Sequence, residues 1–245
     1  MNDQTDPEED ILAELGKLKE EFSKNPSMDN LYQIVVTYHA LGQTERGIGF
    51  AEAFLMQIDN EKERLIQTTM ILSMVEKDEE AIEALKEAES KFSNDAQLKR
   101  YEGMLLNKQK SFKEAADVFD DLLEKSTDDL ESISGKVIAL LGLEKNDLAM
   151  KAYQASIGIT PKEAPQWHFK GMLDGLMQEH VSNMQSGGLG EAQKKKKKKM
   201  LDSFRSIDTL INNFGPDVGN FYRMGQLAGK EAYGLMITEG TQEEG

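Results

Sequence analysis

A regular 34-residue spacing constrains the fold of this 245-residue chain more than any other feature. Rows of equal length begin at Met28, Lys62, Ala96, Leu130 and Ala164. Small residues then align in one column, and mostly larger apolar residues align four positions later. The two columns read Gly47, Ala81, Ala115, Ala149, and Ala51, Leu85, Phe119, Tyr153. A period of this length indicates a stack of similar supersecondary units that bury their apolar faces against one another.

The pattern within each row is helical. Apolar residues recur at intervals of three and four, which predicts helices. Turn-like stretches, IDNEKE, KFSNDAQ and GITPKEAP, predict breaks between the rows. The column of small residues fits places where two helix backbones approach closely, because a large side chain there would force them apart. The sequence therefore predicts an all-α protein.

The rows resemble the tetratricopeptide repeat over about residues 28–180. The most specific stretches are YHALGQTERGIGFAEAFL, YEGMLLNKQKSFKEAADVFDDLL and ITPKEAPQWHFKG. The last combines the inter-repeat Pro161 with Trp167 and Gly171. Gly47 stands where alanine is usual, and Asp174 where an aromatic residue or leucine is usual. The resemblance implies a right-handed α-solenoid of about five antiparallel helix hairpins.

A capping helix is expected at each end, because end repeats would otherwise expose apolar faces. The expected parts are an acidic N-terminus with a capping helix (1–27), the solenoid (28–217), a C-terminal capping helix (218–237) and a disordered tail (238–245). In the N-terminal helix, Asp6 is a predicted N-cap and Pro7 opens the first turn. Its apolar stripe reads Ile11, Leu15, Leu18 and Phe22.

The C-terminal helix repeats part of the fifth row after an insertion. GNFYRMGQLAG matches the aromatic residue and the following glycine of that row, with Phe221 and Gly225 in place of Trp167 and Gly171. We therefore expect an insertion over about 179–199, followed by the second helix of the fifth repeat in MLDSFRSIDTLINNF. The C-terminal helix is also rich in small residues: Gly225, Ala228, Gly229, Ala232 and Gly234. Glycine costs a helix about 1 kcal/mol, so close packing on the fifth repeat or on a partner is expected to offset it.

The insertion ends in a run of six lysines, within a chain whose net charge is −15. They are Lys194, Lys195, Lys196, Lys197, Lys198 and Lys199. One interpretation is a solvated loop and first helical turn; another is a contact for an acidic partner. Nucleic acid, anionic lipid and a nuclear-import signal are further alternatives. No aromatic residue is interleaved with the run, so base stacking has no platform.

The resemblance also implies a binding surface, because first helices in this family line a concave groove that holds ligand peptides. The corresponding residues are Tyr32, Val36, Ile66, Met70, Arg100, Met104, Ile138, His168, Phe169 and Met172. Methionine is flexible and polarizable, which suits varied partners. We expect this groove to receive a hydrophobic or amphipathic segment of another protein. Alternatively, these residues pack against neighbouring first helices or against residues 218–237.

Catalytic chemistry is not indicated. The chain has no cysteine, which excludes disulfides and thiolate sites. His39, His168 and His180 lack a second histidine at helical ligand spacing, so no metal site is predicted. Neither GIGF nor SGGLG has the context of a phosphate loop, and no GxSxG motif is present. We expect no enzyme activity and no cofactor.

The family's clamp for chaperone C-terminal tails is not matched either. That clamp uses lysine, asparagine and arginine. The corresponding positions hold Tyr32, Val36, Gln67, Gln97 and Tyr101.

These observations favour a non-catalytic scaffold or assembly chaperone with a protein or peptide client. The alternative is a constitutive subunit of a larger complex, contacting its neighbours through its outer face and the lysine run. No apolar run approaches the roughly 20 residues of a membrane span. The N-terminus MNDQTDPEED is acidic, unlike a secretory signal or transit peptide. A cytoplasmic location is expected, or an organellar stroma or matrix after removal of a presequence.

Overall fold

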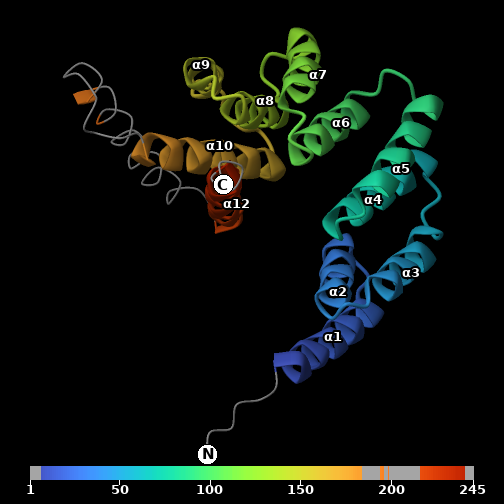
Figure 1. Cartoon of the computed structure of the whole chain (residues 1–245). Coiled ribbons are helices and arrows are strands. Elements are labelled where there is room, and N and C mark those ends of the chain that lie inside the picture. Colours follow the sequence, from blue (N-terminus) through green and yellow to red (C-terminus); the bar gives the residue numbers. More distant parts are fainter. Residues whose placement is uncertain (1–6, 184–193, 196–197, 199–215, 241–245) are drawn as a thin grey trace, which may run out of the picture. The chain divides into compact units, whose positions relative to one another are not determined.

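The computed structural model describes residues 7–183, 194–195, 198 and 216–240 (Figure 1). Within these ranges there is no strand, and eleven helices are described in full. They are α1 (Pro7–Lys24), α2 (Met28–Ala40), α3 (Thr44–Leu55), α4 (Glu61–Met74), α5 (Asp78–Lys91), α6 (Ala96–Lys108), α7 (Phe112–Lys125), α8 (Leu130–Gly142), α9 (Asn146–Ser156), α10 (Ala164–Asn183) and α12 (Pro216–Gly240). The chain divides into two compact units, Met1–Leu105 (unit 1) and Leu106–Gly245 (unit 2).

Consecutive helices pack as pairs. Helix α2 packs with α3, α4 with α5, and α8 with α9, so each pair is formed by one row of the sequence. The predicted all-α fold of paired helices, like that of tetratricopeptide repeats, is confirmed.

The first helix of each pair begins at a side-chain cap that recurs about once per row. Ser27, Asn60, Asp95 and Asp129 each accept a hydrogen bond from the backbone N–H three residues later, at 3.1 to 3.4 Å. Such a cap satisfies a donor that the helix leaves unpaired and typically contributes about 1 kcal/mol. The repeated caps therefore set where α2, α4, α6 and α8 start.

The turn after each of these four helices has the same backbone geometry. Gly42, Glu76, Lys110 and Glu144 have positive φ values, between 57° and 67°. The next residue in each turn donates its N–H to the carbonyl oxygen five positions earlier, at 2.8 or 2.9 Å. These pairs are Gln43–Tyr38, Lys77–Leu72, Ser111–Leu106 and Lys145–Leu140. This is the Schellman motif, so the period of the sequence columns is present in the backbone as well.

The column of small residues lies at close helix contacts, as predicted. A Cβ on Gly47 of α3 would come within 2.9 Å of the Tyr38 Cβ on α2. The matching Ala81, Ala115 and Ala149 are fully buried. One small residue per second helix thus lets the pair approach, while larger side chains fill the space around it.

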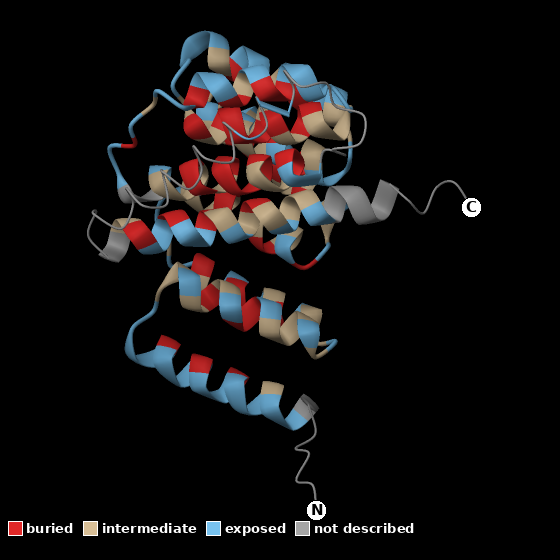
Figure 2. Cartoon of the chain, turned by 90° about the vertical axis from the view of Figure 1, so that its left-hand side faces the viewer, coloured by how far each residue is buried: buried red, intermediate tan, exposed pale blue. Residues whose placement is uncertain are grey.

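Helix α1 covers the first pair of helices in unit 1. Leu15, Leu18 and Phe22 are buried on one face, and the opposite face is exposed (Figure 2). The Phe22 ring packs edge-on against Phe50 and Phe54, with centroid distances of 5.4 and 5.1 Å. The predicted apolar stripe is therefore the face that closes this end of the core.

In unit 2, α12 packs so closely on α10 that the backbones of the two helices touch. A Cβ on Gly225 would lie 1.9 Å from the His168 carbonyl oxygen, and one on Gly229 would lie 2.1 Å from that of Met172. On α10, Gly171 would place a Cβ 2.0 Å from the carbonyl oxygen of Tyr222, and Gly175 would place one 2.2 Å from that of Gln226. No Cβ fits at such distances, so all four positions require glycine.

The contact between α10 and α12 has a local two-fold symmetry. Each helix contributes a G-x-x-x-G ridge, and the four contacts exchange when equivalent positions are swapped (171 with 225, 175 with 229). Trp167 and Phe221 are therefore equivalent in this pair, as the repeated aromatic–glycine pattern predicts. Of the two expected explanations for the small residues, packing on the chain's own fifth repeat is the one observed.

A buried polar network adds to this contact. Asp174 of α10 is fully buried and accepts hydrogen bonds from the hydroxyls of Tyr153 on α9 and Tyr222 on α12, both at 2.8 Å. The Lys170 Nζ lies 3.6 Å from the same carboxylate. Burial raises the pKa of Asp174, while Lys170 and the two hydroxyls oppose the shift. Asp174, which departs from the family pattern, thus links three helices.

Several expected boundaries differ from the observed helices. Helix α10 continues to Asn183, past the expected start of the insertion near residue 179. Helix α12 extends over Pro216–Gly240, so residues 238–240 are helical rather than part of a tail. The expected second helix of the fifth repeat, MLDSFRSIDTLINNF, lies outside the described residues, as do residues 241–245.

Candidate partner-binding surface

The predicted groove residues in unit 1 come from three first helices. Tyr32 and Val36 lie on α2, Met70 on α4, and Arg100 and Met104 on α6. Hydrogen bonds connect these helices laterally. The Tyr32 hydroxyl donates to the Gln67 Oε1 on α4, and the Tyr101 hydroxyl on α6 donates to the Met70 sulfur at 3.2 Å. The Tyr32 hydroxyl also lies 3.6 Å from that sulfur.

We call this surface the inner lane. Its residues are Tyr32, Val36, Gln67, Met70, Met74, Tyr101 and Met104. Three of its apolar side chains are exposed: Val36 (44%), Met74 (40%) and Met104 (45%). The lane therefore combines accessible apolar groups with a bridge of two tyrosines and one methionine.

The polar atoms of the bridge are satisfied within the protein. Gln67, which accepts from Tyr32, donates its Nε2 to Glu63 at 2.5 Å. Burial raises the pKa of Tyr32, and the nearby Tyr101, Glu63 and Asp29 add to the shift. The Tyr32 hydroxyl consequently stays protonated and keeps its hydrogen bond to Gln67. Covering this part of the lane leaves these groups paired, which removes a common cost of binding.

Ile66 differs from its prediction as a groove residue. It is fully buried and packs in the core of unit 1. The neighbouring Gln67 makes the contact with Tyr32 instead. On α6, Tyr101 rather than the predicted Arg100 contacts Met70. Column matching fixes the position of a residue within its row, and it did not show that Ile66 packs into the core.

The predicted groove residues of unit 2 lie among packed helices. Ile138 of α8 and Phe169 of α10 pack against the unit 2 core. His168 and Met172 lie in the part of α10 that contacts α12. Burial lowers the pKa of His168, and a hydrogen bond to the Phe221 backbone opposes the shift. In this unit the contacts match the alternative interpretation, packing against the terminal helix.

The lysine run is only partly described. Lys194, Lys195 and Lys198 are helical and exposed. The other three lysines of the run lie outside the described residues.

Among the described residues, no group of three side chains could hold a metal ion. His39 pairs with the Thr44 hydroxyl at 2.9 Å, and the His180 Nδ1 lies 3.4 Å from the Tyr233 hydroxyl. Within the same ranges, no helix is long and apolar enough to cross a membrane.

The recurring caps, turns and helix pairs define a tetratricopeptide-like helical repeat protein. A solved structure titled MamA RS-1 ArsTM double mutant is 17% identical, with a TM-score of 0.45, over 74% of this chain and 97% of its own. A tetratricopeptide repeat protein from Parabacteroides merdae is 14% identical, with a TM-score of 0.48, over 80% of this chain and 78% of its own. No protein-family model and no curated protein matches the sequence.

Proposed function

We propose that this protein is a non-catalytic scaffold or assembly chaperone, and that its inner lane binds an amphipathic segment of another protein. The observation that carries the proposal is the exposure of Val36, Met74 and Met104 on three successive first helices. Three apolar side chains on one surface are more informative than scattered exposed residues such as Met56.

The chemistry of the lane suits a partner with apolar side chains. Apolar surface gains roughly 25 cal/mol for each Å² removed from water. Met74 and Met104 can adopt several rotamers, so they can adapt to partners of different shape. Tyr32, Gln67 and Met70 are held by hydrogen bonds and give the adaptable side chains a fixed base.

Charge further specifies the partner. Exposed Asp29 and half-buried Glu63 are near Tyr32, at one end of the lane. The chain as a whole carries a net charge of −15. An amphipathic segment with a basic residue beside its apolar face would be attracted to this end, which would raise its association rate.

The test is affinity capture with the full chain, followed by binding of the identified segment as a labelled peptide. Val36→Asp combined with Met104→Asp is expected to weaken peptide binding at least about tenfold, equivalent to about 1.4 kcal/mol. Both side chains are exposed, so the fold should be retained. Met56→Asp is the matched control, because Met56 is 81% exposed and lies outside the lane. Equal peptide binding by the lane variant and the control would refute the proposal.

A second candidate is a constitutive subunit that contacts an acidic neighbour or nucleic acid through the lysine run. The exposure of Lys194, Lys195 and Lys198 favours it. Replacing all six lysines by glutamine should then abolish capture of the neighbour, or binding of a labelled oligonucleotide at low salt. Unchanged capture and no measurable oligonucleotide binding in either form would exclude this candidate.

A further inference from the structure

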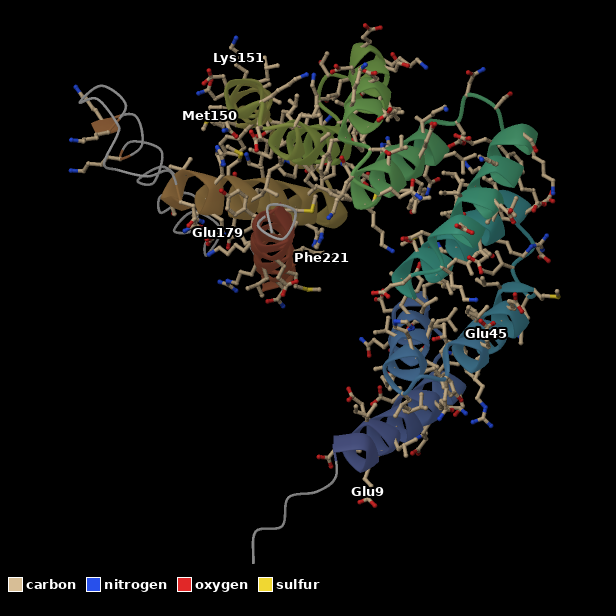
Figure 3. All side chains as sticks on the ribbon, in the orientation of Figure 1. Glu9, Glu45, Met150, Lys151, Glu179 and Phe221 are labelled. Atoms are coloured by element: carbon tan, nitrogen blue, oxygen red, sulfur yellow. The ribbon has the colours of Figure 1, made fainter. Side chains whose placement is uncertain are left out.

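We propose that the outer face of α12 pairs with the same face of a second copy of this chain, in antiparallel orientation. The face is formed by Phe221, Met224 and Leu227, which are 38%, 60% and 62% exposed. Phe221 lies on α12 beside α10 (Figure 3). At 100° per residue, Met224 and Leu227 point away from the glycine ridge of Gly225 and Gly229.

The local two-fold symmetry relates this face of α12 to a face of α10 that is covered by other helices. The swap that matches 171 with 225 also matches Met224 with Lys170 and Leu227 with Leu173. Lys170 and Leu173 are buried where α10 packs on α8 and α9. The equivalent side chains of α12 are exposed. Among the described residues, the face of α10 is covered by α8 and α9, whereas the equivalent face of α12 presents Met224 and Leu227 to solvent.

The charged residues beside this face favour a second copy of this chain as its partner. Arg223 and Glu231 are both exposed, and each stands four residues from Leu227, about one helical turn on either side. An antiparallel pair centred on Leu227 would bring each Arg223 opposite Glu231 of the second copy. The face is therefore self-complementary, as an isologous interface requires.

Helix α12 also carries little net charge, unlike the chain as a whole. Helix α12 contains two basic residues, Arg223 and Lys230, and three acidic residues, Asp217, Glu231 and Glu239, which gives −1. The whole chain carries −15. Two copies that approached through their acidic surfaces would repel each other strongly, whereas two nearly neutral α12 helices would repel each other little.

Sedimentation equilibrium of the full chain tests the proposal over about 1–100 μM, a range that covers associations of moderate affinity. Twice the monomer mass of 27.5 kDa is expected at the upper end. Leu227→Glu should give the monomer mass throughout. Leu148→Glu is the control, because Leu148 is 46% exposed on α9 and should leave the dimer intact. Unchanged fluorescence of the only tryptophan, Trp167, would show that α12 remains on α10.

A charge swap tests the antiparallel register. Arg223→Glu alone should weaken the dimer at least about tenfold, because each Glu231 of the second copy would then face a like charge. Arg223→Glu combined with Glu231→Arg should restore it. A wild-type chain that stays monomeric at about 100 μM, or a dimer that tolerates Leu227→Glu, overturns the proposal. Failure of the double variant to restore the dimer overturns it as well.

Discussion

The pairs formed by each row and the contact between α10 and α12 bring helices together in different ways. In the pair of α2 and α3, a Cβ on Gly47 would meet the Tyr38 Cβ at 2.9 Å and the Val35 carbonyl oxygen at 3.2 Å, and the matching position in later rows is alanine. Between α10 and α12, four glycines each face a carbonyl oxygen of the other helix. In the later rows, the first kind of contact accepts the methyl group of an alanine. The second is a backbone contact that any side chain would separate.

The difference also extends to polar groups. The repeated pairs are bounded by caps and turns whose hydrogen bonds are local in sequence, such as Gln43 to Tyr38. The α10–α12 contact instead includes Asp174, which is bonded to Tyr222 on a helix distant in sequence. Regular repeats can therefore form from short-range interactions, whereas the last helix depends on long-range ones.

The largest effect is expected from Asp174→Asn. The substitution leaves Lys170 buried without its carboxylate and weakens the bonds to Tyr153 and Tyr222. Breaking a buried ion pair typically costs about 3–5 kcal/mol. Urea unfolding followed by Trp167 fluorescence should report the loss in unit 2. A cost below about 1 kcal/mol would mean that the network contributes little to the contact.

The stability difference between wild type and Asp174→Asn should also depend on pH. Burial raises the pKa of Asp174 in the folded state, so the folded chain binds a proton before the unfolded chain as pH falls. The contribution of Asp174 to stability should therefore rise as the pH falls from neutral toward 3.8, the ordinary pKa of an aspartate. Asp174→Asn removes this contribution, so the stability difference between wild type and variant should widen over that range. A constant or narrowing difference would contradict the direction of the shift.

A smaller loss, about 2–3 kcal/mol, is expected for Gly225→Ala, because the new Cβ would force the two helices apart. Gly234→Ala in the same helix is the control. A Cβ there meets nothing within 4 Å, so alanine should stabilise the helix by about 0.5–1 kcal/mol. Thermal unfolding by circular dichroism and by Trp167 fluorescence measures both. Equal effects of the two substitutions would show that the backbone contact does not require glycine.

The smallest effect, about 1 kcal/mol, is expected at the hairpin turns, where a left-handed backbone strains residues other than glycine. Glu76→Gly and Glu144→Gly should stabilise the chain, and Gly42→Ala should destabilise it. Chemical denaturation followed by circular dichroism measures the free energy of unfolding of the three variants. If Gly42→Ala is neutral while the glycine variants destabilise, these turns do not carry the strain that their φ values imply.

The inner lane was predictable in part. The register of the sequence rows placed Val36, Met70 and Met104 on three first helices; Val36 and Met104 are exposed, and Met70 contacts Tyr101. It failed at Ile66, which is buried, because a column fixes a position within each row without showing which side chains cover it. Packing decides that, and Gln67 and Tyr101 make the lateral contacts instead.

The hairpin turns were missed for a different reason. Glycine usually marks a left-handed residue, and only Gly42 among the four carries that signal. At Glu76, Lys110 and Glu144 the repeated packing of the helices on both sides imposes the conformation. The sequence columns predicted the correct period without identifying the residues at which the backbone reverses.

The helices, their pairing and their period follow from the sequence alone, because periodic apolar residues and small residues at close contacts act over short distances. Three further features depend on how the helices pack: two G-x-x-x-G ridges meet, Asp174 joins α9, α10 and α12, and α12 leaves an apolar face exposed. Backbone approach, burial and desolvation are set by which helices become neighbours. Those neighbours include positions as distant in sequence as 168 and 225, beyond the reach of any local pattern.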